Sequence, residues 1–495
     1  MNIGMSKVID EGKYKRQLEG TNKWKANNGI GTLHYTMRFG KTYVGILIMQ
    51  RVLEHNPNCK IIIIVPSIVI INNWANAIED EGLNKDNITI ATSHEVLNGK
   101  YNNVVYRLRI IDEVHKFFTD ERFKIISGEV IKSPFLLCLT GSLPADISKL
   151  SQYCPIIDSI TEQEAIDNNW ISNYTEYNLG LELSDEDKIG YIKFSEPISE
   201  TLRLFKNCHK LFKLQEEIYL FKDEYDLIQS CYSGKKISKG YIKAYIIREQ
   251  LASKMGWSKK LDLSTSQGKA LEDYWNPVNL EIRTKTFVNF VRKRTEIIHN
   301  NTIKLNAVLD IYNKFPNKTI CFNESIDFAE RIKDSIRFTL NMSAICYHSK
   351  IISSSLIDPN TNQYYLYMSG AKVGEPKMFG KKAILDDMLK GMINGKYNFL
   401  STARALDEGI DIPNLEQIIT TAGSANPIQY SQRSARAKTI DCYNPSKIAR
   451  IINLYFDDFQ SEGETIRCRD KQKLRLRQKF SNSNVNWVNS LDDVF

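Results

Sequence analysis

The sequence predicts an α/β protein in which two parallel-sheet units are separated by a helical insert. Short apolar runs rich in β-formers alternate with helical stretches from Ile30 to about Ile160. Such alternation is typical of a parallel sheet with covering helices. The same alternation returns from Lys304 to Phe456. Between the two units, residues 185–300 form long charged and apolar segments with the spacing of helices.

The individual elements follow from these runs. In the first unit we expect a helix over 43–53 and strands in 30–35, 59–66, 88–92, 104–112 and 135–140. In the insert we expect helices over 202–225 and 241–254. In the second unit we expect strands in 318–323, 343–348, 397–402, 417–421 and 448–455. The resulting divisions are a first α/β domain (1–182), a helical insert (183–300), a second α/β domain (301–460) and a basic C-terminal tail (461–495).

Composition narrows the class of protein. The chain has 495 residues, 42% of them hydrophobic and 25% charged, as in ordinary multidomain globular proteins. Its nine cysteines are scattered, with no Cys-x-x-Cys pair, which favours a reducing, cytoplasmic compartment. The longest purely apolar run, Ile61–Val65, is far too short to span a bilayer, and the N-terminal residues are polar, so we expect no membrane segment and no signal peptide. A net charge of +8 permits a polyanionic partner.

The segment Thr36–Thr42 has the features of a phosphate-binding loop. It ends in Gly40-Lys41-Thr42, after an expected strand and before an expected helix, so backbone N–H groups of Arg38, Phe39 and Gly40 could face phosphates. Lys41 would contact the β- and γ-phosphates, and the Thr42 hydroxyl would bind Mg²⁺. Such loops usually carry Gly or Ala six positions before the lysine, where this chain has Tyr35.

A second segment supplies the acids that a phosphate loop needs. Asp112 and Glu113 follow the apolar run Leu108–Ile111. An acid at the end of a strand can hold Mg²⁺, and its neighbour can orient or deprotonate the attacking water. Together the two segments predict an ATPase that uses ATP and Mg²⁺, with Thr42 and Asp112 as the metal ligands.

Further motifs occur in the order found in one known family. They are Lys15-Arg-Gln17, Ile64-Val-Pro-Ser67, Ala91-Thr-Ser93, Asp112-Glu-Val-His115, Leu139-Thr-Gly-Ser142, Cys321-Phe-Asn-Glu-Ser325, Ser401–Asp411 and Gln432-Arg-Ser-Ala-Arg436. This series resembles the superfamily 2 helicases and translocases, in which two RecA-like domains bind ATP between them. The fold class implied is thus α/β, with two RecA-like parallel-sheet domains in tandem and an inserted helical region.

The resemblance implies roles for residues that match the motifs. Gln17, Gly409 and Asp411 would contact the nucleotide, and Gln432, Arg433 and Arg436 would act on it from the second domain. Contacts with nucleic acid would come from Ser67, Thr92, Ser325 and Thr402, and coupling between the sites from His115, Thr140 and Ser142. The last arginine position of the final motif is Thr439 here, and its usual glycine is Ala435. Either Lys438 substitutes, or one arginine suffices, or turnover is slow.

The resemblance implies an ATP-dependent helicase or translocase that acts on nucleic acid, DNA in preference to RNA, in replication, recombination or repair. The Met-Arg-x-Gly-Lys-Thr loop is similar to that of compact bacteriophage helicases. We expect a monomer with possible replication or recombination protein partners. An RNA helicase is one alternative, and a degenerate, ATP-gated scaffold subunit that binds nucleic acid is another, because of Tyr35, Ala435 and Thr439.

Two segments lie outside the motifs. Residues 467–479 carry the densest basic cluster, which either contacts phosphates or forms a solvated face, and 481–495 is expected to be poorly ordered. Residues 351–379 are an insertion with an aromatic patch at Tyr364, Tyr365 and Tyr367, expected to form a β-hairpin that reaches nucleic acid. Trp74 is expected to be a core or interface aromatic, and His348 to be structural.

Overall fold

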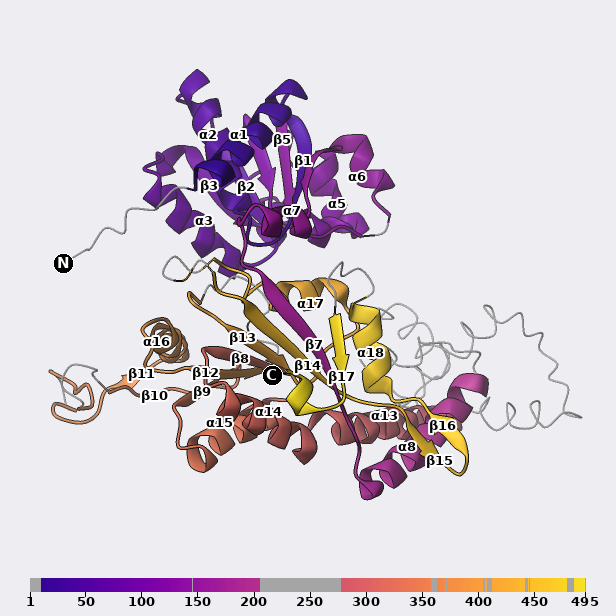
Figure 1. The fold of residues 1–495 in the computed structure, drawn as a ribbon. Helices are drawn as coiled ribbons and strands as arrows, with labels where there is room; N and C mark the ends of the chain where they lie inside the picture. The colour runs from indigo at the N-terminus through magenta and orange to yellow at the C-terminus, as the bar shows by residue number, and fades with distance from the viewer. Residues whose placement is uncertain are drawn as a thin grey trace, which may run out of the picture. The chain divides into compact units, whose positions relative to one another are not determined.

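The computed structural model describes residues 10–144, 146–204, 277–357, 363–369, 372–403, 406, 412–440, 444, 446–478 and 485–494. Figure 1 shows the fold, and by its internal contacts the chain divides into two compact units. One comprises residues 1–181, 304–455 and 469–495 and contains two large sheets, and the other comprises 182–303 and 456–468. The helices expected over 202–225 and 241–254 lie almost wholly outside the described residues.

The first sheet has six strands in the order β3-β2-β4-β5-β1-β6, and all its pairings are parallel. Every residue of its Ile61–Val65 strand is buried, because alternate side chains enter the cores on opposite faces of the sheet. The strands are β1 (Ile30–Tyr35), β2 (Ile61–Val65), β3 (Ile88–Thr92), β4 (Leu108–Ile111), β5 (Phe135–Thr140) and β6 (Ile156–Ile160). The helices are α1 (Glu11–Ala26), α2 (Lys41–His55), α3 (Ile68–Asp80), α4 (Ser93–Leu97), α5 (Asp120–Ser127), α6 (Ser148–Tyr153) and α7 (Glu162–Asp167), with 3₁₀ turns at Lys85–Asn87 and Val114–Phe117.

The second sheet has seven strands in the order β17-β7-β14-β13-β8-β12-β9. Its central strand β8 pairs in parallel with both β12 and β13. The strands are β7 (Tyr174–Leu181), β8 (Thr319–Asn323), β9 (Ala344–Tyr347), β12 (Phe399–Ala403), β13 (Gln417–Thr420), β14 (Ala449–Phe456) and β17 (Val485–Val488). The helices are α14 (Thr302–Lys314), α15 (Ile326–Thr339), α16 (Lys381–Ile393), α17 (Pro427–Ser434) and α18 (Arg469–Arg477), with a 3₁₀ turn at Leu491–Val494 and two short strands, β10 (Ser354–Ser355) and β11 (Met378–Phe379).

The remaining unit is built on two long helices, α8 (Asp185–Leu204) and α13 (Pro277–His299), with the hairpin β15 (Phe459–Ser461) and β16 (Glu464–Ile466). The rings of Phe194 and Phe290 stack with centroids 6.0 Å apart, so the two helices share an aromatic contact. The predicted class, two RecA-like parallel-sheet domains with a helical insert, is confirmed. No described helix has both the length and the apolar character that crossing a bilayer requires.

Two strands differ from the expected divisions. Residues 174–181 were assigned to the first domain with no strand expected there, but they form β7 of the second sheet, and β17 adds a further strand beside it from a segment expected to be poorly ordered. The buried positions of β7 include Glu176 and Asn178, whose polar side chains hide the usual apolar signal of a strand. Glu176 accepts hydrogen bonds from Gln478 at 2.6 Å and Asn453 at 3.0 Å, so its burial is satisfied by partners distant in the sequence.

The basic tail is also anchored in the core. The Lys304 ammonium is fully buried and donates to Asp470 Oδ2 at 2.5 Å and to the Thr421 carbonyl at 2.6 Å. Asp470 lies at the start of α18, so this ion pair ties the tail to the segment that enters the second sheet domain. Arg477 on the same helix is buried over the Tyr430 ring, and burial lowers the pKa of its guanidinium to about 10. The tail is therefore part of the folded domain, although Arg467, Arg469 and Arg475 are exposed.

The Lys304–Asp470 pair yields a stability prediction. Asp470→Ala should lower the free energy of unfolding by about 3–5 kcal/mol, because it leaves a buried ammonium without its counter-ion. Replacing both partners by apolar residues, Lys304→Met with Asp470→Leu, should recover much of that loss. The measurement is the midpoint of urea unfolding. Lys85→Ala, which breaks the exposed Lys85–Glu79 pair, is the control and should shift the midpoint little. A loss for Asp470→Ala no larger than for the control would contradict the assigned pair.

Candidate active site

The phosphate loop leaves the carboxyl end of β1 and enters α2 at Lys41. Gly40 caps this helix with φ of 99°, a conformation that favours glycine, and Arg38 also has positive φ, 68°. A Cβ on Gly40 would lie 2.8 Å from Gln17 Nε2, so the close approach of Gln17 also requires glycine there. The first N–H groups of a helix have no partners within the helix. The loop is thus shaped to present N–H groups to an anion at the start of α2.

Two side chains of α1 donate hydrogen bonds to backbone carbonyls of this loop. Gln17 is buried and donates from Nε2 to the carbonyl of Phe39 at 3.2 Å. Lys13 donates to the carbonyls of Arg38 at 3.3 Å and Trp170 at 3.0 Å, and burial lowers the pKa of its ammonium. The sequence did not single out Lys13. Gln17, predicted to read the base of the nucleotide, contacts the loop backbone directly in this structure.

The unusual Tyr35 is accommodated without blocking the loop. Its ring is fully buried, and its hydroxyl donates to Asp158 at 2.7 Å. A Cβ on Gly20 would overlap that hydroxyl, so glycine on α1 makes the room that the tyrosine needs. The ring of Phe39 packs edge-on against Tyr35 with centroids 5.3 Å apart. Phe39 was predicted to contact the nucleotide, but its side chain is in the core, so only its backbone is placed to do so.

The acids Asp112 and Glu113 follow β4. Asp112 is buried and accepts a 2.8 Å hydrogen bond from the indole of Trp74 and one of 2.9 Å from the Glu113 N–H. Burial, followed by the charge of Glu113, raises the pKa of Asp112 to about 6, while Trp74 and Lys41 act in the opposite direction. A divalent cation would favour the ionised carboxylate. Trp74 therefore orients the Asp112 carboxylate, a role that the sequence did not assign to it. The only sequence feature that could have indicated this role is the pair Asn73-Trp74, which follows the Ile64–Ser67 motif.

The segment after β5 connects the acids to the phosphate loop. The ring of His115 lies 3.1 Å from the Thr140 hydroxyl and 3.3 Å from the Glu113 carboxylate. Thr140 in turn donates to the carbonyl of Ser142 at 2.5 Å. A Cβ on Gly141 would lie 3.0 Å from Lys41 Nζ, so this turn adjoins the lysine. His115, Thr140 and Ser142 thus form one chain of contacts that begins at the Glu113 carboxylate, and the turn at Gly141 within it adjoins Lys41.

The second sheet domain contributes α17 and the residues after it. Arg433 and Arg436 are both buried, and Arg433 lies 3.5 Å from the Glu324 carboxylate and over the ring of Phe322. Gln432 is half-buried beside them on α17. The carbonyl of Ala435 accepts a 3.3 Å hydrogen bond from Arg38 Nε of the phosphate loop. This contact brings the predicted arginine motif next to the loop.

Lys438 has a different role from the one considered for it. Its ammonium is 2.8 Å from the Glu162 carboxylate and 3.8 Å from the centroid of the Tyr174 ring. Burial acts to raise the pKa of Glu162, but the charge of Lys438 and hydrogen bonds from Lys438 and Tyr174 outweigh burial and lower it. Lys438 is thus already bound in a partly buried ion pair, which argues against its replacing the arginine absent at Thr439.

The predicted contacts with nucleic acid divide into two groups. Ser67, Thr92 and Ser325 stand at the N-caps of α3, α4 and α15, next to the carboxyl ends of strands. Thr402 was predicted to join them, but it is fully buried in β12 and its hydroxyl donates to the Tyr347 carbonyl at 2.8 Å, so its side chain cannot reach a ligand here. Gly409 and Asp411 lie outside the described residues.

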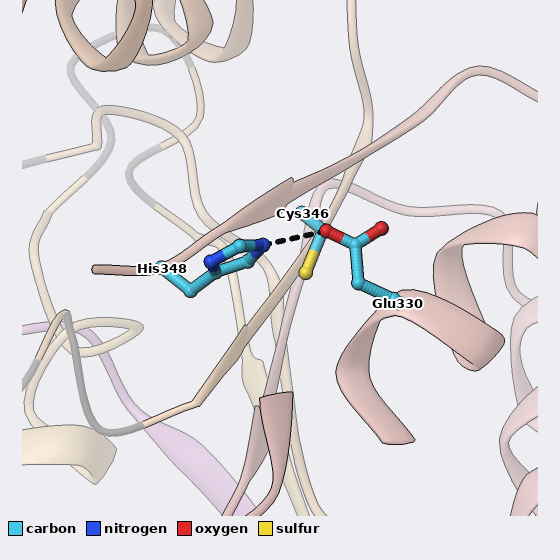
Figure 2. A group of neighbouring side chains, drawn as sticks. All are labelled: Glu330, Cys346 and His348. Carbon is cyan, nitrogen blue, oxygen red and sulfur yellow. Dashed lines mark hydrogen bonds and ion pairs between the residues drawn. The ribbon is translucent and has the colours of Figure 1, made fainter. Parts of the chain in front are cut away.

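Figure 2 shows Glu330 on α15 facing Cys346 and His348. One ligand atom from each residue lies within 4.8 Å of the others, a spacing that can hold a metal ion. The hydrogen bonds favour a structural role. His348 Nδ1 accepts from the Lys350 N–H at 3.1 Å, so in the neutral ring Nε2 carries the proton and donates to Glu330 at 2.6 Å. Lys333 also donates to Glu330, at 2.5 Å, and its charge would repel a metal ion. We therefore assign the cluster to positioning the end of β9.

Comparisons with known proteins agree with this arrangement. Residues 373–440 match the family of the helicase conserved C-terminal domain. This match, over residues 373–440, supports the similarity to superfamily 2 helicases that the ordered motifs indicate.

Individual relatives are distant. The putative ATP-dependent RNA helicase MJ1505 of Methanocaldococcus jannaschii is 21% identical over 449 residues, 80% of this chain and 53% of the relative. This chain therefore spans about half the length of that protein. The structure of yeast Dbp5 (S. cerevisiae) bound to RNA and ADP with BeF3 has a TM-score of 0.51 at 11% identity, covering 97% of this chain and 90% of Dbp5. The Hef helicase domain of Pyrococcus furiosus has a TM-score of 0.49 at 15% identity, with 93% and 97% covered.

Substitutions of the two acids and of the lysine should have different effects on nucleotide binding and on turnover. Glu113→Gln keeps the shape but cannot accept a proton, so nucleotide should bind while turnover falls by roughly 10²-fold or more. Asp112→Asn, which can still accept from Trp74, should weaken the binding of Mg²⁺–ATP itself. Lys41→Ala should abolish turnover without opening a core cavity. Phosphate release and calorimetric titration of an ATP analogue measure these effects. Equal nucleotide affinity for the Glu113 and Asp112 variants would contradict the division.

The arginine motif yields a separate prediction. Arg436→Ala should lower turnover by about 10²-fold or more with little change in nucleotide affinity, since such a group acts mainly in the transition state. Lys438→Ala should lower the unfolding midpoint, because it breaks the pair with Glu162, yet leave the turnover of the folded protein within a few-fold of wild type. Arg436→Lys controls for charge alone. Severe loss of turnover in Lys438→Ala with an unchanged midpoint would show instead that the lysine has replaced the missing arginine.

Proposed function

We propose that this chain is an ATP- and Mg²⁺-dependent helicase or translocase that acts on nucleic acid. The observation that carries the proposal is the convergence of three loops at one edge of the first sheet. The loops after β1, β4 and β5 bring together Lys41, the pair Asp112–Glu113, and the turn at Thr140. Phosphoryl transfer depends mainly on such positioning and on charge stabilisation, because it asks little covalent chemistry of the protein.

Each group has a defined task in this proposal. The N–H groups of the phosphate loop and the Lys41 ammonium bind the phosphates, and Thr42 with Asp112 binds Mg²⁺. Glu113 takes the proton of the attacking water, and its 3.3 Å contact with His115 links that step to Thr140 and Ser142. Arg436, with Gln432 and Arg433, stabilises the charge that develops on the transferred phosphoryl group. Coupling arises because these last residues belong to the other sheet domain.

The polymer on which the motor acts is the second part of the proposal. Ser67, Thr92 and Ser325 lie beside the carboxyl ends of strands, where backbone N–H groups of α3, α4 and α15 can bind phosphates. We favour DNA, on the likeness of the phosphate loop to those of compact phage helicases. RNA is the second candidate, because one relative is named an RNA helicase and Dbp5 was solved with RNA.

The decisive experiment compares ATP hydrolysis by the full chain alone and with saturating single-stranded DNA, duplex DNA, forked DNA or RNA. We expect basal hydrolysis that depends on Mg²⁺ and rises at least several-fold with one class of polymer. Glu113→Gln is the control and should show no stimulation. Hydrolysis that no polymer stimulates would contradict the motor, and binding of nucleic acid without any hydrolysis would identify an ATP-gated scaffold instead.

A further inference from the structure

We propose that the insertion between β9 and α16 binds single-stranded nucleic acid by stacking bases on the exposed tyrosines of its described parts, residues 351–357, 363–369 and 372–379. This inference rests on the proposed function, and it adds that the insertion would contact the bases of the nucleic acid. The insertion includes β10 and β11, which Figure 1 shows extending away from the rest of the second sheet near α16. Nothing in the ATP site requires it.

The described parts of the insertion form a small antiparallel arrangement of three segments. Ser354 and Ser355 pair with Phe379 and Met378. The middle segment lies between the others through hydrogen bonds from the Tyr365 N–H to the Leu356 carbonyl at 3.1 Å and from the Lys377 N–H to the Tyr365 carbonyl at 2.6 Å. Backbone bonds thus hold the aromatic segment in an extended form, with successive side chains on opposite faces.

This arrangement has no core of its own. No described residue of the insertion is buried, and its exposed fractions include 52% for Tyr364, 89% for Met368 and 78% for Ile352. Three short strands normally need a covered apolar face to be stable. Clustered apolar and aromatic groups on a surface usually mark a site of interaction. The insertion therefore presents side chains that a partner would cover.

Charge indicates the class of that partner. Within the insertion two lysines, Lys372 and Lys377, balance two acids, and three further lysines, Lys350, Lys381 and Lys382, flank it, so the positive charge lies where the insertion joins the domain. The Lys377 ammonium lies 5.3 Å from the centroid of the Phe379 ring, which also packs against Tyr365 at 5.6 Å. Aromatic rings interleaved with cations form the surface on which single-stranded nucleic acids bind, with rings stacking on bases and ammonium groups contacting phosphates. A surface rich in carboxylates would have indicated a different partner.

The position of the insertion agrees with this assignment. It leaves the second sheet at the carboxyl end of β9, and β9 pairs with β12, which pairs with β8. The N-cap Ser325, one of the proposed phosphate contacts, follows β8 at the same edge of the sheet. The hydrogen bond from His348 to Glu330 fixes the start of the insertion on α15. A nucleic-acid strand bound at Ser325 would therefore pass the point where the insertion leaves the second sheet.

The test measures binding of a fluorescein-labelled oligothymidylate to the full chain without nucleotide, by anisotropy. Tyr364→Ala keeps the Tyr365–Phe379 contact and should weaken binding about tenfold, as expected for the loss of one stacked base. The double change Tyr364→Phe with Tyr365→Phe keeps the rings and should bind within about twofold of wild type. Phe338→Ala removes a ring on α15 that is more exposed than Tyr364 and lies outside the insertion, and this variant should bind as wild type does.

A second variant tests the lysines. Lys372→Ala with Lys377→Ala should reduce the slope of log affinity against log salt by about 0.7 for each lost phosphate contact. Basal ATP hydrolysis should be unchanged in all these variants. If Tyr364→Ala binds as tightly as wild type and the lysine variant keeps the slope, the inference is overturned while the proposed function stands. If the wild-type chain binds no nucleic acid at all, the proposed function fails first.

Discussion

The first sheet places Lys41, the pair Asp112–Glu113 and the turn after Thr140 at the carboxyl ends of parallel strands. In the order β4-β5-β1, the loop with the acids, the coupling turn and the phosphate loop leave neighbouring strands at one edge. Residues 25 positions apart in sequence thereby come within hydrogen-bond distance, as the contact between His115 and Thr140 shows, and His115 in turn contacts Glu113. Ligand sites of open parallel sheets form at this edge for the same reason.

Buried polar networks hold the helices on both sides of the site. Asp158 accepts from Arg16, Lys23 and Tyr35, which joins α1 to the first sheet. Burial acts to raise the pKa of Asp158, but these hydrogen bonds outweigh it and lower the pKa to about 2. In the second domain, Glu176 contacts the hydroxyl of Tyr430 on α17. The helix with the arginine motif is therefore positioned in part by a buried contact with β7.

The sequence predicted the parts of the fold whose strands are buried on both faces, such as Ile61–Val65, because such strands are continuous apolar runs. It could not predict β7 and β17, since Glu176 and Asn178 are buried polar residues that only tertiary partners satisfy. In the site, local motifs placed Lys41, Asp112 and Glu113 at the ends of strands. The roles of Trp74 and Lys438 depend on contacts with residues distant in the sequence. A motif does not show in which direction a hydroxyl points, so the sequence could not show that the Thr402 hydroxyl donates to the Tyr347 carbonyl and not to a ligand.

The central claim is that one nucleotide site is built from the loop at Lys41 and the acids at Asp112. A structure of the chain with Mg²⁺ and a non-hydrolysable ATP analogue tests it most directly. The account predicts the γ-phosphate within hydrogen-bond distance of Lys41 Nζ, and the metal ion coordinated by the Thr42 hydroxyl and linked to the Asp112 carboxylate. A nucleotide bound elsewhere, or a metal ion remote from Asp112, would contradict it.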